Sequence, residues 1–247
     1  MKIKSFFYIA FSILISFNSL AQNKERKFKI HTLAFYNLEN LFDTINDVNK
    51  NDEASPIMEI KFNRGNIYKQ KVTNMARVIS EIGYDVTNRP PTIIGICEVE
   101  NRNVVEDLIA NEKLSKYNYG IVHYDSPDRR GIDVGLLYNK DIFKVINSNS
   151  HVLYINYNNT SDRSYTRDQL VVSGKLDGEL IHLIVNHWPS RGADETKRMA
   201  AAEVNNSIID SLRKIHNNPK IITMGDFNDD PFDLSLIHIW RCRRPMV

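Results

Sequence analysis

Polar side chains that could bind a metal ion or a phosphate group stand directly after four strand-like runs of the chain. They are Asn37 and Glu39 after the first run, Glu98 after the second, His187 after the third, and Asp226 and Asn228 after the fourth. Open sheets collect their ligand-binding groups at strand ends, where the connecting loops diverge. We therefore expect these side chains, which are distant in sequence, to converge on one site.

The residue types indicate which ligand such a site would hold. Carboxylate and amide oxygens are hard donors that suit Mg²⁺, Mn²⁺ or Ca²⁺. No cysteine pair or histidine-rich spacing in the sequence indicates a structural zinc ion. A hard cation held by one or two carboxylates is the usual arrangement for phosphate-ester chemistry. The pattern therefore predicts a Mg²⁺ site, with Mn²⁺ or Ca²⁺ as alternatives, and a phosphate-ester substrate.

Each of these candidates also has a structural interpretation. Glu98 could be an exposed acid at a strand end, His187 a structural histidine, and Asp226 a turn residue. Glu39 could be an ordinary loop acid, and Asp133 could have a purely structural role.

Arginine and tryptophan side chains add candidates for substrate binding. Arginine can grip phosphate through paired hydrogen bonds, although a surface position is the simpler interpretation of any single arginine. The four candidates are Arg129, Arg130, Arg167 and Arg191. Trp188 could stack on a base, or it could belong to the core or its rim.

The composition is that of a folded domain. The chain has 247 residues, of which 42% are apolar and 10% aromatic, which is enough for one large domain or two small ones. The formal net charge is +2, but two lysines and three arginines lie near the ends, and without them 27 basic residues stand against 30 acidic ones. This balance is not the footprint of a nucleic-acid-binding surface. Phosphates would therefore be attracted by a metal ion and a few local arginines.

Residues 1–21 have the pattern of a secretory signal peptide. Lys2 and Lys4 precede the apolar run 6–17, and residues 19–21 form a small-residue cleavage site. The run is too short to span a bilayer comfortably; a buried helix or a membrane anchor is the alternative. We expect a secreted or periplasmic protein without stable membrane insertion, and nothing in the sequence indicates an obligate protein partner.

Hydrophobic periodicity predicts irregularly alternating strands and helices. Strands are expected over 28–36, 92–97, 119–123, 132–138, 145–154, 169–176, 180–186 and 220–225, and helices over 67–82, 103–114 and 195–215. Gly83 is expected to cap the first helix, residues 37–63 to form a long loop, and Cys97 to lie in the core. The pattern suits two packed sheets with helices on the outside.

Five short motifs, taken together, resemble the endonuclease/exonuclease/phosphatase superfamily, including its pancreatic-type deoxyribonuclease members. The motifs are Asn37-Leu38-Glu39-Asn40, Glu98-Val99-Glu100-Asn101, Arg130-Gly131-Ile132-Asp133, Asn186-His187 and Gly225-Asp226-Phe227-Asn228. Each is weak alone, but all five occur in family order, beside predicted strands, over residues 28–234. The resemblance implies an α/β fold: a four-layer sandwich of two mainly antiparallel sheets flanked by helices.

The resemblance also implies roles for the strand-end residues. Glu98 would be the principal metal ligand and Glu39 a second metal-binding carboxylate, with Asn37 holding that carboxylate or the phosphate. Asp226 would orient or deprotonate the attacking water, and Asn228 would bind the phosphate or the nucleophile.

Further implied roles concern the transition state and the substrate. His187 would donate a hydrogen bond to the phosphate oxygens, and Asp133 would orient His187. Asp133, Arg130, Trp188 and Arg191 are the expected substrate-binding residues. Donors aimed at oxygens that gain charge supply most of the catalysis in such reactions, and removing one typically costs about 10²–10³ in rate.

The chain departs from the family pattern at its C-terminal end. Family members carry a final Ser-Asp-His or similar segment well after Gly-Asp-x-Asn, and His238 follows Asn228 too closely to be the corresponding histidine. Residues 235–247 are interpreted as a non-native tail, with a genuine basic tail as the alternative. The domain over 22–234 would then be incomplete, with its last strands missing. We expect little or no activity from the chain as written.

Three functional hypotheses follow. The first is a secreted, divalent-metal-dependent nuclease that hydrolyses phosphodiester bonds in DNA or RNA. The near-neutral charge gives some support to the second, a phosphomonoesterase or a sphingomyelinase-like phospholipid phosphodiesterase. The third is a non-catalytic binding module that keeps the scaffold.

Overall fold

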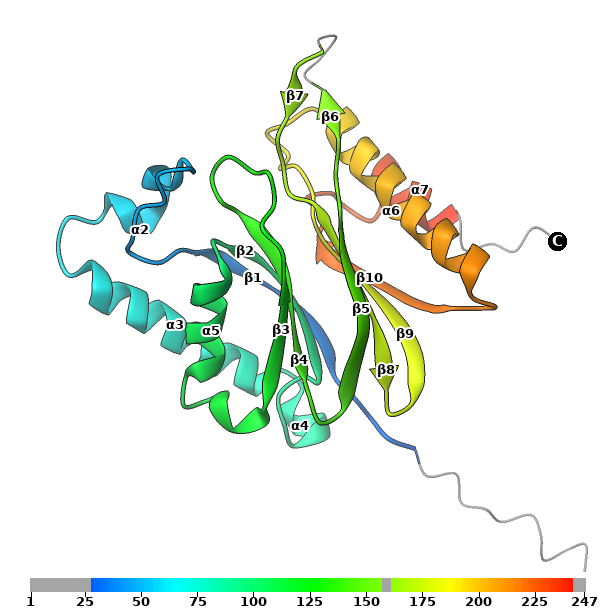
Figure 1. The fold of residues 1–247 in the computed structure, drawn as a ribbon, viewed down its shortest axis with the longest axis horizontal. Coiled ribbons are helices and arrows are strands. Elements are labelled where there is room, and N and C mark those ends of the chain that lie inside the picture. Colours follow the sequence, from blue (N-terminus) through cyan, green and yellow to red (C-terminus); the bar gives the residue numbers. More distant parts are fainter. Residues whose placement is uncertain (1–27, 157–160, 242–247) are drawn as a thin grey trace, which may run out of the picture. The chain divides into compact units, whose positions relative to one another are not determined.

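Two four-stranded β-sheets form the centre of the structured unit that begins at His31 (Figure 1). The computed structural model describes residues 28–156 and 161–241, so the predicted signal peptide and Cys242 lie outside the described residues. No helix within these two ranges is long and apolar enough to cross a membrane.

The first sheet has the strand order β1-β2-β4-β3. Its strands are β1 (Leu33–Leu41), β2 (Ile93–Val99), β4 (Asp133–Asn139) and β3 (Tyr119–His123). β1 and β2 run parallel, and the other two pairs are antiparallel. The carboxyl ends of β1 and β2 therefore lie at the same end of the sheet.

The second sheet repeats this arrangement in the order β10-β9-β8-β5. Its strands are β10 (Lys220–Asp226), β9 (Glu179–His187), β8 (Gln169–Leu176) and β5 (Phe143–His151). β9 and β10 are parallel, and the other pairs are antiparallel. A separate short pair is formed by β6 (Ile155–Asn156) and β7 (Arg163–Ser164). Both large sheets are thus mainly antiparallel, as predicted, and each has one parallel pair at an edge.

Helices cover the outer faces of the two sheets (Figure 1). α3 (Arg64–Glu81) and α5 (Arg102–Ala110) pack on the first sheet, while α6 (Glu195–Ile215), with α7 (Leu234–Arg241) beside it, covers the second. The shorter elements are η1 (Asp52–Ala54), α2 (Pro56–Glu59), α4 (Tyr84–Thr87) and η2 (Ser115–Tyr117). The layers are therefore helix, sheet, sheet and helix.

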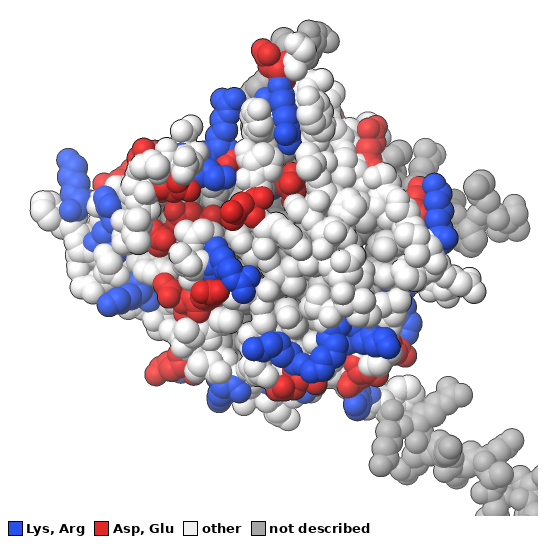
Figure 2. Space-filling model, viewed as in Figure 1, with Lys and Arg blue, Asp and Glu red and all other residues white. Residues whose placement is uncertain are grey.

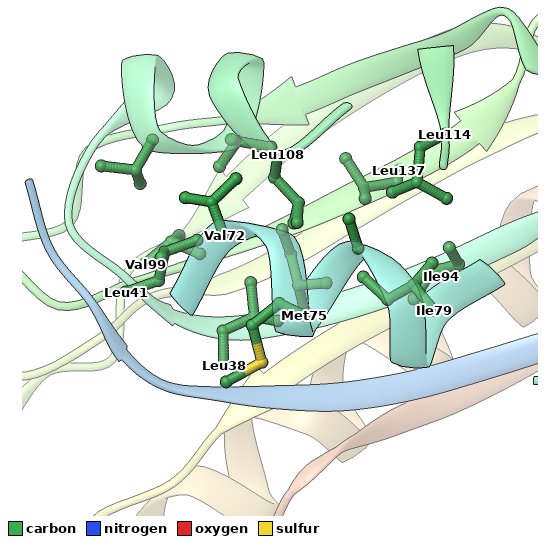
Figure 3. Close-up of a cluster of buried hydrophobic side chains, with 14 of the residues drawn as sticks. Leu38, Leu41, Val72, Met75, Ile79, Ile94, Val99, Leu108, Leu114 and Leu137 are labelled. Carbon is green, nitrogen blue, oxygen red and sulfur yellow. The ribbon is translucent and has the colours of Figure 1, made fainter. Parts of the chain in front are cut away.

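Three apolar layers hold this sandwich together. Leu136 and Leu183 belong to the layer between the sheets, and Ile79 and Leu108 to the layer under α3 and α5, which Figure 3 shows. The third layer lies under α6 and includes Ile184. Burying one Leu or Ile side chain contributes about 1.5–3 kcal/mol. The apolar layers therefore fix how the sheets face each other, and the polar strand ends are left at the rim.

Most of the predicted elements are present. The strands over 119–123 and 169–176 and the helix over 195–215 have the predicted bounds. Gly83 has a φ of 64°, the left-handed conformation expected just after a helix. Cys97 is fully buried in the core, as predicted.

The predictions for the first strand and the following loop were partly wrong. β1 begins at Leu33 and continues to Leu41, inside the predicted loop 37–63, and η1 and α2 occupy another part of that loop. The polar residues that end β1 serve the rim rather than the core, so hydrophobic periodicity does not detect them.

Part of the predicted tail 235–247 is helical. α7 begins at Leu234, and its Leu236 and Ile239 are buried in the layer under α6. A helix of this length was not predicted, because the segment was set aside as non-native. That residues 235–247 are non-native stays a prediction.

Candidate active site

The two parallel strand pairs end at the same edge of the sandwich. Asn37 pairs with Cys97 across β1 and β2, and Asp226 pairs with His187 across β10 and β9. The side-chain amide of Asn37 donates one hydrogen bond to Glu98 Oε1 (2.9 Å) and another to Asp226 Oδ2 (3.1 Å). The structure thus brings these strand-end residues of both sheets into one cluster.

A β-bulge in β2 aims Glu98 at this edge. The register with β4 shifts between Cys97 and Val99, and Glu98 has a φ of 59°, a left-handed conformation that is uncommon for residues with a side chain. Such backbone strain costs of order 1–3 kcal/mol and is concentrated at functional sites. Oε2 of Glu98 accepts a hydrogen bond from the backbone N–H of Asn40 (2.9 Å). Together with the bond from Asn37, this fixes both carboxylate oxygens.

β1 is irregular where it reaches the site, and Lys71 of α3 holds the irregular segment. Glu39 and Asn40 both have positive φ values, 49° and 57°. The Lys71 ammonium group donates hydrogen bonds to the carbonyls of Glu39 and Asn40. Burial lowers the pKa of Lys71, against the opposing effect of the Glu39 and Glu98 charges. The Glu39 residue is exposed, and its backbone N–H binds Oδ1 of Asn37 (2.8 Å).

The Gly-Asp-Phe-Asn motif forms the end of β10. A side chain at Gly225 would collide with the backbone carbonyl of Asn186 on β9, so only glycine fits there. Asp226 accepts a hydrogen bond at Oδ1 from the backbone N–H of Asn228 (3.0 Å), in addition to the Asn37 bond at Oδ2. The Asn228 side chain donates to the carbonyl of Trp188 (3.0 Å). Asp226 is therefore held by Asn37 of β1, and Asn228 by Trp188, which directly follows β9.

His187 lies against Glu98 and is almost fully buried. Its Nε2 is 3.7 Å from Glu98 Oε1, and its Nδ1 is buried without a hydrogen-bond partner among the described residues. Burial lowers the pKa of His187 to about 3, and the positive charges of Arg167 and Arg130 act in the same direction. The imidazole is therefore neutral at physiological pH and carries a single N–H, which suits a hydrogen-bond donor.

The expected pairing of Asp133 with His187 is wrong. Oδ2 of Asp133 lies 3.1 Å from Nε2 of His123, and Oδ1 accepts the backbone N–H of Ser126 (2.7 Å). The Asp133 residue is 1% exposed, so it is not available to a substrate either. The reason is the strand order: Asp133 begins β4, whose far neighbour is β3 with His123.

Trp188 is also not a substrate-stacking residue, because it is fully buried. Its Nε1 donates to Oδ1 of Asn186 (3.1 Å), and its ring packs edge-on against Phe227 at a centroid distance of 4.9 Å. The core interpretation of this tryptophan is therefore the correct one.

The predicted arginines have different surroundings. Arg191 is exposed and pairs with Asp230 (2.7 Å), while its Nε donates to the carbonyl of Asn228 (3.1 Å). Arg130 pairs with Asp128 at 3.1 Å. Arg167 is buried, and it donates to Asp128 (3.2 Å) and to the carbonyl of Trp188 (2.6 Å). Among these three arginines, Arg167 and Arg130 add to the lowering of the pKa of His187 by burial, and the Asp128 carboxylate opposes them.

Two motif residues have structural roles. Glu100 accepts the backbone N–H of Asp43 (2.7 Å), and burial raises the pKa of Glu100 to about 7. Asn101 caps α5 by accepting the backbone N–H of Val104 (3.1 Å). Glu100 thus holds the segment after β1, and Asn101 holds the start of α5, just after the Glu98 bulge.

Three residues that contact or surround the candidate site were not predicted from the sequence to belong to it: Cys97, Asp128 and Lys71. Cys97 was interpreted as core only, yet its sulfur, a nitrogen of His187 and an oxygen of Asp226 lie within 4.8 Å of one another. Asp128 stands in the same turn as two of the candidate arginines, which was the available signal. No local signal marks Lys71, because it reaches the bulge from α3 through the tertiary fold.

The donor set fits a hard divalent cation. Glu98 and Asp226 present carboxylate oxygens that retain free lone pairs after their hydrogen bonds. Burial raises the pKa of Cys97, as do the nearby charges of Glu98 and Asp226, and its soft sulfur does not suit a hard cation. Oxygen ligands with one imidazole nearby suit Mg²⁺ or Mn²⁺ better than zinc.

The comparison with known protein families identifies the family of the chain. The family model described as "Endonuclease/Exonuclease/phosphatase family" matches residues 32–244. The chain belongs to this family. Members of the family are hydrolases that act on phosphoester bonds and generally use divalent metal ions. No curated protein sequence matches the chain.

Solved structures share the family fold. A family protein from Bacteroides thetaiotaomicron is 16% identical, with a TM-score of 0.57, over 85% of this chain and 68% of that one. The mannosyl-6-phosphatase Bt3783 of the same organism is 17% identical, with a TM-score of 0.56, over 86% and 71%. The human Nocturnin catalytic domain, solved with bound sulfate, is 18% identical with a TM-score of 0.52 over 68% of this chain, which spans 61% of that domain. At these identities the likeness concerns the fold alone.

Proposed function

We infer that this family domain acts as a secreted, divalent-metal-dependent phosphodiesterase, with a nuclease as the first hypothesis. The observation that carries the inference is the Asn37 amide, which joins Glu98 of one sheet to Asp226 of the other. Packing of the apolar core does not require two carboxylates, an amide and a neutral histidine to lie together at one rim of the sandwich. Family membership supports phosphoester hydrolysis as the reaction.

The residues have complementary roles in this proposal. Glu98 and Asp226 would hold the cation, which when bound offsets the negative charge of the phosphate. His187, neutral because it is buried, would donate its N–H to a phosphate oxygen. An oxygen of Asp226 would accept a hydrogen bond from the attacking water, and Asn228 would keep that carboxylate in position through its backbone N–H.

The second candidate is a phosphomonoesterase. The near balance of basic and acidic residues supports a small substrate, because strong binding of duplex nucleic acid needs many Lys and Arg contacts. The fold similarity to a mannosyl-6-phosphatase is compatible with a sugar phosphate. Secretion is proposed from residues 1–21 only, which lie outside the described part of the chain.

Metal binding tests this proposal without requiring turnover. Isothermal titration of Mg²⁺ and Mn²⁺ into the wild-type chain is compared with Glu98→Gln and with the control Glu106→Gln, an exposed glutamate of α5. We expect saturable binding that Glu98→Gln weakens at least about tenfold and that the control does not change. Equal affinities in all three proteins would reject Glu98 as a ligand.

Hydrolysis assays then separate the candidate functions. Plasmid DNA, sphingomyelin and mannose 6-phosphate are each incubated with the protein in Mg²⁺ and in EDTA. Cleavage of DNA that stops in EDTA supports the nuclease, and release of phosphate from the sugar supports the phosphomonoesterase. Metal binding without turnover of any substrate would agree with the binding module and with the low activity expected of the chain as written.

A further inference from the structure

A small basic pocket adjoins the candidate active site. Its volume is about 200 Å³, and it is lined by the turn at 128–130, by residues 164–167 of the β7–β8 connection, and by residues 189–193 before α6. Four cationic side chains line it, Arg129, Arg130, Arg167 and Lys197, against the single carboxylate of Asp128. Such an excess of positive charge in a concave site favours an anionic ligand.

Two polar groups of the pocket lining are buried and unpartnered. The hydroxyl of Thr166 and the Nε of Arg167 have no hydrogen-bond partner among the described residues, and each residue is 5% exposed. A buried donor left unsatisfied costs about 1–3 kcal/mol. Native proteins rarely retain such groups without a ligand, water or ion to pair with them. These two donors therefore point to an oxygen-rich ligand.

The pocket is fixed rather than loosely assembled. Arg167 is held by Asp128 (3.2 Å) and by the carbonyl of Trp188 (2.6 Å). Arg129 lies over the Tyr165 ring at 5.1 Å, and Arg163 approaches the same ring at 4.9 Å. Lys and Arg side chains gather over the β6–β7 pair at the top of Figure 2, above a band of acidic side chains. A preorganised pocket binds its ligand at a lower entropic cost.

The pocket is linked to the candidate active site through one backbone carbonyl group. The Trp188 carbonyl accepts hydrogen bonds from both Arg167 and Asn228, so one backbone group joins the pocket to the Asp226 loop. Pro189 and Ser190 of the lining follow His187 directly in the chain. The positive field of Arg167 and Arg130 reaches His187, whose pKa it helps to lower. A ligand in the pocket would therefore be bound by residues that share a backbone hydrogen-bond acceptor with the Asp226 loop.

We propose that this pocket is a subsite for a second phosphate group of the substrate, which rests on the phosphoesterase function proposed above. The volume admits one tetrahedral oxyanion with a few waters, and guanidinium and hydroxyl donors match its oxygens. The substrate class is a phosphodiester with another phosphate one sugar away, as in a nucleotide chain. A choline phospholipid is disfavoured, because its second charged group is a cation that the pocket would repel.

Phosphate binding in EDTA tests the subsite independently of catalysis. Inorganic phosphate is titrated calorimetrically into the metal-free wild type and into Thr166→Val, Lys197→Met and Lys214→Met. Thr166→Val removes a hydroxyl without a partner, so no loss of stability is expected. Lys214 is an exposed lysine in the last turn of the same helix as Lys197, which makes it the matched control. We expect saturable millimolar binding, weakened about tenfold by the first two variants and unchanged in the control.

The kinetic arm uses thymidine 5′-(p-nitrophenyl phosphate) with and without a 3′-phosphate. The 3′-phosphate is expected to raise kcat/KM about tenfold, and Lys197→Met and Thr166→Val are expected to bring this ratio towards one. Equal turnover of both esters by every protein, with no phosphate binding in EDTA, would overturn the subsite and leave the proposed function standing. Phosphate binding that depends on Thr166 and Lys197, with no binding of Mg²⁺ or Mn²⁺ and neither ester cleaved, would support the anion site and overturn the proposed function.

Discussion

Asn37 at the end of β1 donates a hydrogen bond to Asp226 at the end of β10, at 3.1 Å and across 189 residues of sequence. The second N–H of the same amide binds Glu98 at 2.9 Å. One neutral side chain thus lies between two carboxylates from different sheets and sets their directions. This makes Asn37 a positioning residue for the proposed metal ligands.

Replacing Asn37 by alanine is therefore expected to weaken metal binding. Both carboxylates lose a hydrogen bond that orients them, and loss of such a supporting contact typically lowers metal affinity about 10–100-fold. Titration calorimetry with Mn²⁺ measures the effect. Asn40→Gly is the control, because it keeps the backbone N–H that binds Glu98 and tolerates the left-handed φ of 57°. Equal affinities of Asn37→Ala and the wild type would contradict the positioning role.

Lys71 is expected to stabilise the irregular end of β1. Its ammonium group binds the carbonyls of Glu39 and Asn40, so Lys71→Met removes two charge-assisted hydrogen bonds from a strained segment. We expect a loss of about 1.5–3 kcal/mol in the free energy of unfolding and faster hydrogen exchange of the Asn40 amide. Lys69→Met, at an exposed position of the same helix, is expected to change neither quantity. Unchanged exchange at Asn40 in Lys71→Met would show that the bulge is held by other contacts.

The buried ion pair of Arg198 and Asp229 is expected to matter for stability. Arg198 Nε lies 2.6 Å from Asp229 Oδ1, and both side chains are less than one-tenth exposed. Asp229→Asn leaves the guanidinium buried without its counter-charge, which costs about 3–5 kcal/mol. Urea unfolding measures this loss. Asp230→Asn breaks the exposed pair with Arg191 and is expected to cost less than about 1 kcal/mol; equal losses in the two variants would be inconsistent with this difference in burial.

The buried His182 side chain is expected to make the stability of the fold depend on pH. It is 1% exposed on the outer face of the second sheet, with Nδ1 2.7 Å from the Ser173 hydroxyl. Burial lowers the pKa of His182, and His216 lowers it further. His182 therefore binds a proton more readily in the unfolded chain than in the folded one. The contribution of neutral His182 to the free energy of unfolding is complete above about pH 6.5 and is lost as the pH falls below that value.

His182→Asn is accordingly expected to lose less stability than the wild type when the pH falls from about 7.5 to about 5.5. The measurement is the free energy of unfolding in urea at both pH values. Ser211→Ala, a change in the same region that removes no titrating group, is the control and should show the wild-type pH dependence. An identical decrease in His182→Asn and the wild type would mean that this histidine does not contribute.

Much of the fold could be predicted because its signals are local. The helix over 195–215 and the strand over 169–176 repeat apolar residues at their own periods, and the observed bounds match. The two-residue strands β6 and β7 are too short to carry such a period. α7 is long enough, and it was missed only because its segment was interpreted as non-native.

The candidate site could be predicted in its members but only partly in its contacts. Residue type and position after a strand were sufficient to select Asn37, Glu98, His187 and Asp226, which the structure places in one cluster. The partner of Asp133 could not be predicted, because it depends on β3 lying next to β4. The contacts of Arg191 with the acidic turn after β10 likewise depend on how two loops fold beside each other.

The sequence by itself determined which segments become strands and helices and which polar residues stand at their ends, because both depend on residues that are close together in the chain. The tertiary structure alone decided which of those polar groups meet. The apolar layer between the sheets brings the ends of two parallel strand pairs to one rim, and the bulge at Glu98 turns its carboxylate towards Asn37. Burial then set the chemistry, since it keeps His187 neutral and removes Trp188 from any contact with a substrate.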